Sequence, residues 1–113
     1  MKTDNVKLSK IQKVAFEEIH SFLKNWFPIQ SVILFGSFAR GGGDPEADVD
    51  LLILTKNQLN RLERHKITDL VFEINLKYDT NFSTLVLDKH SWENGIYSVL
   101  PIKKEILKEG VEL

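Results

Sequence analysis

The chain has 113 residues, no cysteine, a hydrophobic fraction of 42% and a formal net charge of −1 at pH 7. This length suits one domain, residues 1–113, and the lack of cysteine excludes disulfides and thiolate chemistry. The near-neutral charge argues against nucleic acid as a direct ligand, because such binding depends on an excess of lysine and arginine. No apolar run approaches the roughly 18 residues that span a membrane, and the polar N-terminus leads into no signal segment. We therefore expect a cytoplasmic protein with no membrane partner.

The first predicted elements are an amphipathic helix and a short strand. Apolar residues recur at steps of three and four over residues 8–27, and Pro28 ends this pattern. The face they predict comprises Leu8, Ile11, Ala15, Ile19, Phe22, Leu23 and Trp26. Residues 31–35 then predict a strand that is apolar from Val32 to Phe35, and so buried on both faces.

A second strand, a long helix and a third strand follow the glycine-rich segment. The strand covers residues 48–54, and Thr55 with Gln58 three residues later predicts a capping box that opens a helix over residues 56–78. The buried side of this helix is predicted to comprise Leu59, Leu62, Ile67, Leu70, Val71 and Ile74. The third strand covers residues 82–87.

Two short helices complete the chain. Asp88 is placed to cap a short helical turn, and a last helix starts at Pro101 and stops at Gly110. The order of elements predicts a single α+β domain.

The octapeptide LFGSFARG, residues 34–41, ends the first strand in a turn. The N–H groups at the start of such a turn lack partners within it and attract an anion. Gly36 lets a phosphate approach the backbone, Ser37 adds a hydroxyl donor, and Arg40 can reach a phosphate or a carboxylate. A plain turn capped by Ser37 accounts for the same residues without any ligand.

Asp48 and Asp50 stand two residues apart at the start of the second strand. Their side chains therefore project from one face, about 6.6–6.8 Å apart along the strand. Two such carboxylates repel each other unless a cation lies between them, and oxygen ligands favour Mg²⁺ or Mn²⁺. A solvated strand end is the alternative explanation for this pair.

The glycine-rich segment resembles the signature of the polymerase-β-type nucleotidyltransferases, in which a Gly-Ser pair precedes two aspartates. Here the pair is Gly36-Ser37, and Asp48-x-Asp50 follows after ten residues. Within that superfamily the chain is most similar to the minimal nucleotidyltransferases, through LFGSFARG, ADVDLLIL, DLVFEINLKYD and KKEILKEGVEL. The resemblance implies a short mixed sheet packed against helices. It also implies transfer of a nucleoside monophosphate from an NTP, with ATP as the first candidate, to a hydroxyl group. By this resemblance, Asp48 and Asp50 would bind Mg²⁺ or Mn²⁺, and Gly36 and Ser37 would bind the phosphates. Arg40 would either contact a phosphate or fix the conformation of the loop.

One departure from the family pattern concerns a third carboxylate that active members usually carry on the next strand. Ser83 and Thr84 occupy that region here, while Asp88 is explained as a helix cap, and Asp79 is expected in the preceding turn. Glu73 is expected on a solvated helix face. The third acid is therefore not identified.

The resemblance also implies a HEPN-domain ribonuclease as partner, silenced by modification of a tyrosine, so that the two proteins act as toxin and antitoxin. A second hypothesis is a nucleotide-binding module of low catalytic power that neutralises the same partner by contact alone, and a third is a nucleotide-sensing subunit.

The remaining features of the sequence point to no further site. His20, His65 and His90 show no metal-ligand spacing. The loop of residues 41–46, with its three consecutive glycines, is expected to be mobile when the site is empty. Self-association stays open.

Overall fold

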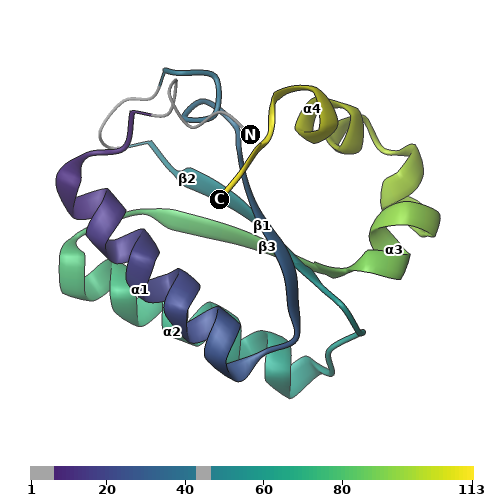
Figure 1. Ribbon diagram of the computed structural model, residues 1–113, viewed down its shortest axis with the longest axis horizontal. Helices are drawn as coiled ribbons and strands as arrows, with labels where there is room; N and C mark the ends of the chain where they lie inside the picture. The colour runs from purple at the N-terminus through teal and green to yellow at the C-terminus, as the bar shows by residue number, and fades with distance from the viewer. Residues whose placement is uncertain (1–6, 43–46) are drawn as a thin grey trace.

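A four-stranded mixed sheet lies between two pairs of helices in the computed structural model, which describes residues 7–42 and 47–113 (Figure 1). The chain runs α1 (Lys10–Trp26), β1 (Ile29–Phe35), β2 (Val49–Thr55), α2 (Arg61–Tyr78), β3 (Phe82–Asp88), α3 (Lys89–Asn94), η1 (Ile96–Val99), α4 (Pro101–Glu109) and β4 (Val111–Glu112). The strand order is β3-β2-β1-β4, in which only β2 and β3 are parallel. The predicted α+β class is confirmed.

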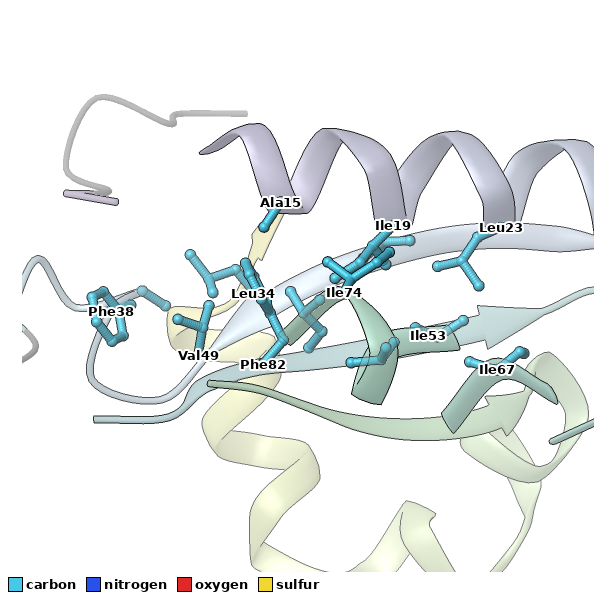
Figure 2. Packing of buried hydrophobic residues seen from close by; sticks show 14 of the residues in the cluster. Ala15, Ile19, Leu23, Leu34, Phe38, Val49, Ile53, Ile67, Ile74 and Phe82 are labelled. Atoms are coloured by element: carbon cyan, nitrogen blue, oxygen red, sulfur yellow. The ribbon is translucent and has the colours of Figure 1, made fainter. Parts of the chain in front are cut away.

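The two faces of the sheet carry separate apolar clusters because successive side chains of a strand point to opposite faces. Val49, Leu51 and Ile53 of β2 pack towards α1 and α2, in the larger cluster shown in Figure 2. Leu52 and Leu54 of the same strand pack on the other face with Trp92 of α3 and Ile106 of α4. Asp50 shares this second face, at the end of β2 where the strand begins.

Helix α1 follows the prediction in position but buries a narrower face. Ser9 and Gln12 form a capping box at its start, and Ala15, Ile19 and Leu23 are buried, whereas the predicted face also included three residues that are exposed. These residues are Ile11, Phe22 and Trp26. The sheet contacts a stripe of α1 narrower than its apolar surface.

The predicted capping box at Thr55 is wrong. Thr55 ends β2 and its hydroxyl donates to the Asn57 carbonyl at 2.7 Å, while the capping box that opens α2 is formed by Asn60 and Glu63. Leu62 was expected in the core but is 73% exposed. Helix α2 therefore starts later than predicted and carries apolar residues on a face that the sheet does not cover.

Strands β1 and β4 also differ from the prediction. Strand β1 buries only alternate residues, Val32 and Leu34, while Ile33 and Phe35 are partly covered. Strand β4 was not predicted, and it pairs with β1 through Ile33–Glu112 and Leu34–Val111. A two-residue strand carries no periodicity, so only the tertiary structure reveals it.

The expectation of a mobile loop over residues 41–46 falls largely on residues 43–46, which lie outside the described residues. None of the described helices is long and apolar enough to cross a bilayer.

The helix cap at Asp88 supplies a first prediction. Its carboxylate accepts the Ser91 backbone N–H at 2.9 Å and the Ser91 hydroxyl at 2.7 Å, and these bonds hold the pKa of Asp88 below its usual value. Asp88→Ala is expected to lower the free energy of unfolding by about 1 kcal/mol at pH 7. Because the folded-state pKa is lowered, this contribution is present above the ordinary carboxyl pKa and is lost as the pH falls through the folded value.

Chemical denaturation of wild type and Asp88→Ala at pH 7 and at pH 2 measures this loss. Asp88→Asn is the control, because the amide keeps an acceptor for the Ser91 N–H at both pH values. Equal stability of wild type and Asp88→Ala at pH 7 would contradict the cap.

Candidate functional site

The segment after β1 forms a tight turn that is anchored in the core. Gly36 has a φ of +79°, a left-handed conformation that side chains rarely adopt. The amides of Ala39 and Arg40 donate to the carbonyls of Gly36 and Ser37, each at 3.1 Å, and Phe38 and Ala39 are buried. The amides of Ser37 and Phe38 precede the first donor of the turn, so the turn's own hydrogen bonds do not use them.

Gly36 lies against the carboxylate of Asp50. The antiparallel register pairs Phe35 with Asp50, which places the residue after Phe35 beside the start of β2. A Cβ atom at position 36 would overlap Oδ2 of Asp50 and lie 3.3 Å from its Cγ. The turn and the carboxylate, which the sequence signature joins into one predicted site, therefore lie side by side.

Asp48 and Asp50 differ in their surroundings. Asp48 precedes β2 and is exposed, whereas Asp50 is partly buried within the strand. Burial raises the pKa of Asp50 above its usual value, the negative charge of Asp48 raises it further, and the charge of Arg40 opposes both. The ionised form of Asp50 is thus destabilised in this structure, which a bound cation would reverse.

The parallel pairing of β2 with β3 decides which residue stands beside Asp50. Asp50 pairs with Ser83, and Leu51 pairs with Thr84, so Ser83 shares the face of Asp50. Ser83 is exposed. Asp88 lies at the opposite end of β3, paired with Thr55.

The other acids considered in the sequence lie elsewhere. Glu73 is exposed on α2, and Asp79 is the C-cap of that helix, with a φ of 54°. Within residues 7–42 and 47–113, no group of three or more metal-binding side chains gathers, and none of the three histidines joins Asp48 and Asp50.

Arg40 connects the turn to α4. Its Nη1 lies 3.3 Å from Oε1 of Glu105 and 3.1 Å from Oε2 of Glu109, which are neighbours one helical turn apart. Neither glutamate was predicted from the sequence, although their spacing of four on the last helix was a usable signal. This arrangement favours the role of Arg40 in holding the turn.

Removal of Arg40 gives a second prediction. Arg40→Gln is expected to raise the pKa of Asp50 further, because the opposing positive charge is lost. The free energy of unfolding should fall by no more than about 1 kcal/mol, since all three charged side chains are partly exposed. NMR titration of the aspartate carboxyl groups measures the first effect and chemical denaturation the second.

Lys77→Gln is the matched control, because it breaks the 3.0 Å pair with Glu18 between α2 and α1 without touching the turn. The Asp50 titration should not move in that variant. A lower Asp50 pKa in Arg40→Gln would contradict the electrostatic assignment.

The family model for polymerase beta nucleotidyltransferases matches residues 17–113 of this chain. The chain belongs to this nucleotidyltransferase family. It is 38% identical over 84 residues to a protein of Methanocaldococcus jannaschii that carries the provisional name protein adenylyltransferase, covering 74% of this chain and 83% of that protein. A second protein of that organism with the same provisional name is 43% identical over 60 residues, covering 51% of this chain and 41% of that protein.

Solved structures share the fold of this nucleotidyltransferase at lower identity. A protein provisionally described as a minimal nucleotidyltransferase superposes with a TM-score of 0.61 at 17% identity, over 93% of this chain and 97% of that one. A mutant of the toxin–antitoxin complex MntA–HepT superposes with a TM-score of 0.58 at 18% identity, over 95% of this chain and 72% of that one. A Shewanella oneidensis complex of a tri-AMPylated HEPN toxin with an MNT antitoxin superposes with a TM-score of 0.53 at 17% identity, over 88% of this chain and 69% of that one.

Proposed function

We propose that this nucleotidyltransferase transfers an adenylyl group from ATP to a hydroxyl group of a partner protein, with Asp48 and Asp50 as its catalytic carboxylates. The observation that carries the proposal is the close approach of Gly36 to the Asp50 carboxylate. It joins a turn suited to phosphate with a carboxylate pair suited to a cation. The provisional names of the two M. jannaschii relatives support both the adenylyl group and the protein acceptor.

The residues present fit a hard divalent cation. Asp48 and Asp50 offer only oxygen atoms, which Mg²⁺ and Mn²⁺ prefer. The raised pKa of Asp50 reflects burial and repulsion that a cation would relieve. We therefore assign Mg²⁺ or Mn²⁺ to these two side chains, where the ion would neutralise charge on the triphosphate.

The turn after β1 is assigned to the phosphates. Gly36 carries no side chain to block the backbone, the Ser37 hydroxyl can donate, and the amides of Ser37 and Phe38, which the turn's own hydrogen bonds do not use, can donate to an anion. Holding the outer phosphates there positions the α-phosphate for in-line attack. The acceptor oxygen then bonds to the α-phosphorus, the bond to pyrophosphate breaks, and the hydroxyl proton passes to solvent.

The proposed acceptor is a HEPN-domain toxin in the same cytoplasm, modified at a tyrosine hydroxyl. The support is the shared fold with the antitoxins of the HEPN complexes. In this proposal Arg40 keeps the turn in place through Glu105 and Glu109 and does not bind phosphate.

A second candidate function is neutralisation of that toxin by binding alone. Ser83 favours it, because a hydroxyl instead of a carboxylate stands beside Asp50, and the described residues offer no third acid at the site. Two carboxylates leave the acceptor hydroxyl without an obvious base.

Labelling with ATP separates the two functions. The protein is incubated with Mg²⁺ and either α-³²P-ATP or γ-³²P-ATP, with and without a HEPN-domain protein as the candidate acceptor. Adenylyl transfer predicts label on the partner from the α-labelled ATP only, and none with Asp50→Asn. Absence of label with Mg²⁺ or Mn²⁺, together with full inhibition of the partner by Asp50→Asn, would overturn the enzymatic proposal in favour of binding alone.

A further inference from the structure

Asn75 lies near the end of α2 and uses its side chain on a neighbouring strand. Its Oδ1 accepts the backbone N–H of Phe82 at 2.9 Å, and its Nδ2 donates to the backbone carbonyl of the same residue at 3.0 Å. The Thr80 hydroxyl donates to the same Oδ1 at 2.9 Å. An asparagine inside a helix is unfavourable for the helix itself. The bonds to β3 therefore explain this residue better than its place in α2 does.

The Asn75 amide takes the place of a neighbouring strand. Strand β3 lies at the edge of the sheet, and Phe82 is its first residue. The outer side of an edge strand has no further strand to pair with its N–H and C=O groups. Because Phe82 is only 5% exposed, unpaired backbone groups at this position would be costly. One side chain satisfies both of them and so fixes the start of β3.

The start of β3 in turn holds the start of β2. The backbone N–H of Val49 donates to the carbonyl of Asn81 at 2.8 Å. That carbonyl and the N–H of Phe82 belong to one planar peptide group, which therefore bonds to Asn75 on one side and to Val49 on the other. Val49 stands between the two aspartates of the candidate site. The Asn75 amide is thus connected, through a single peptide group, to the backbone that carries the carboxylate pair.

We propose that Asn75 is a positioning residue of the candidate active site, which holds Asp48 and Asp50 in a fixed relative position for a divalent cation. It does not touch either carboxylate but acts through the peptide group between Asn81 and Phe82. Without the amide, this peptide group loses its partner on the outer side of the sheet, and the start of β2 loses a fixed acceptor. The inference rests on the proposed function, because a bound cation is what makes the relative position of the two carboxylates matter.

Amide hydrogen exchange of the metal-free protein tests the positioning directly. We expect Asn75→Ala to speed exchange of the Val49 amide, relative to that of Ile53 further along β2, by about fivefold or more. Asn60→Ala is the matched control, because Asn60 caps the opposite end of the same helix and does not contact β3. Its loss should lower the stability and leave the ratio of the two exchange rates as in wild type.

Mn²⁺ affinity, measured by electron paramagnetic resonance well below the unfolding transition, tests the consequence for the site. We expect Asn75→Ala to weaken Mn²⁺ binding by about tenfold and Asp50→Asn to weaken it further, whereas Asn60→Ala should keep the wild-type affinity. Thr80→Val removes only the hydroxyl that orients the Asn75 amide. It should shift both measurements in the same direction by a smaller factor, and it serves as the test if Asn75→Ala does not fold.

The outcomes separate this inference from the proposed function. Wild-type exchange of the Val49 amide in both Asn75→Ala and Thr80→Val would overturn the inference. Wild-type Mn²⁺ affinity in these two variants, with weakened binding in Asp50→Asn, would overturn it as well and leave the proposed function standing. Failure of the proposed function appears in the wild type itself, as a protein that binds no Mn²⁺, and that result would overturn both.

Discussion

Asp50→Asn is expected to lower nucleotidyl transfer by about a thousandfold or more, because the variant loses the charged side chain that we propose as a cation ligand, and a cation's effect on the transition state is worth several kcal/mol. The amide keeps the size of the side chain, so the turn at Gly36 should keep its position. Initial rates with ATP and saturating Mg²⁺ measure this loss.

The same substitution is expected to stabilise the free protein at neutral pH. Burial and the charge of Asp48 raise the pKa of Asp50 in the folded state. Ionisation therefore costs stability as the pH rises through the folded pKa, whereas below the ordinary carboxyl value Asp50 is neutral in both states. Asp50→Asn avoids that cost, so its melting temperature should exceed that of wild type at pH 7 and approach it near pH 3.

Thermal unfolding measured without divalent cations tests the change in stability, and the same measurement with Mn²⁺ tests cation binding. Added Mn²⁺ should raise the melting temperature of wild type and leave Asp50→Asn almost unchanged, because a ligand that binds only the folded state stabilises it. Asp79→Asn is the matched control, since asparagine tolerates the left-handed conformation of that position. A less stable Asp50→Asn at pH 7 would contradict the electrostatic interpretation.

Gly36→Ala is expected to damage both the fold and the site. A side chain at a φ of +79° costs about 1–3 kcal/mol of folding free energy. The added methyl group also overlaps Oδ2 of Asp50 and displaces the carboxylate. A displacement of about 1 Å lowers activity by about a hundredfold, so the activity should fall even where the variant remains fully folded.

Chemical denaturation and rates measured well below the unfolding transition separate these two effects. Gly42→Ala is the control, because its φ is not in the left-handed region and the nearest atom to an added Cβ, the Ser37 carbonyl oxygen, lies at 3.7 Å. It should resemble wild type in stability and rate. A Gly36→Ala variant with normal activity would show that Asp50 does not need its observed position.

Local patterns predicted most of the elements because the physical causes are local. The proline at 28, the glycine at 110 and the cap at Asp88 act on their immediate neighbours, and all three end or begin elements as expected. The capping box at Thr55 was predicted wrongly because Asn60 and Glu63 offer the same chemistry five residues later. Local sequence preference alone does not decide which of two possible capping boxes begins the helix.

Burial on the helices was less predictable. Leu62 and Trp26 fit the periodicity of their helices, yet they are 73% and 74% exposed. A helix with apolar residues on more than one side has several possible inward faces, and only packing against the sheet selects one.

The sequence by itself determined the family, the Gly36-Ser37 turn and the carboxylate pair Asp48 and Asp50, because each depends on residues close together in the chain. Only the tertiary structure decided how they meet. Strand register, set by hydrogen bonds between distant segments, places Asp50 beside Gly36 on one side and Ser83 on the other. Packing of the last helix likewise brings Glu105 and Glu109 to Arg40. Such contacts join residues on different strands and helices, and no local pattern specifies them.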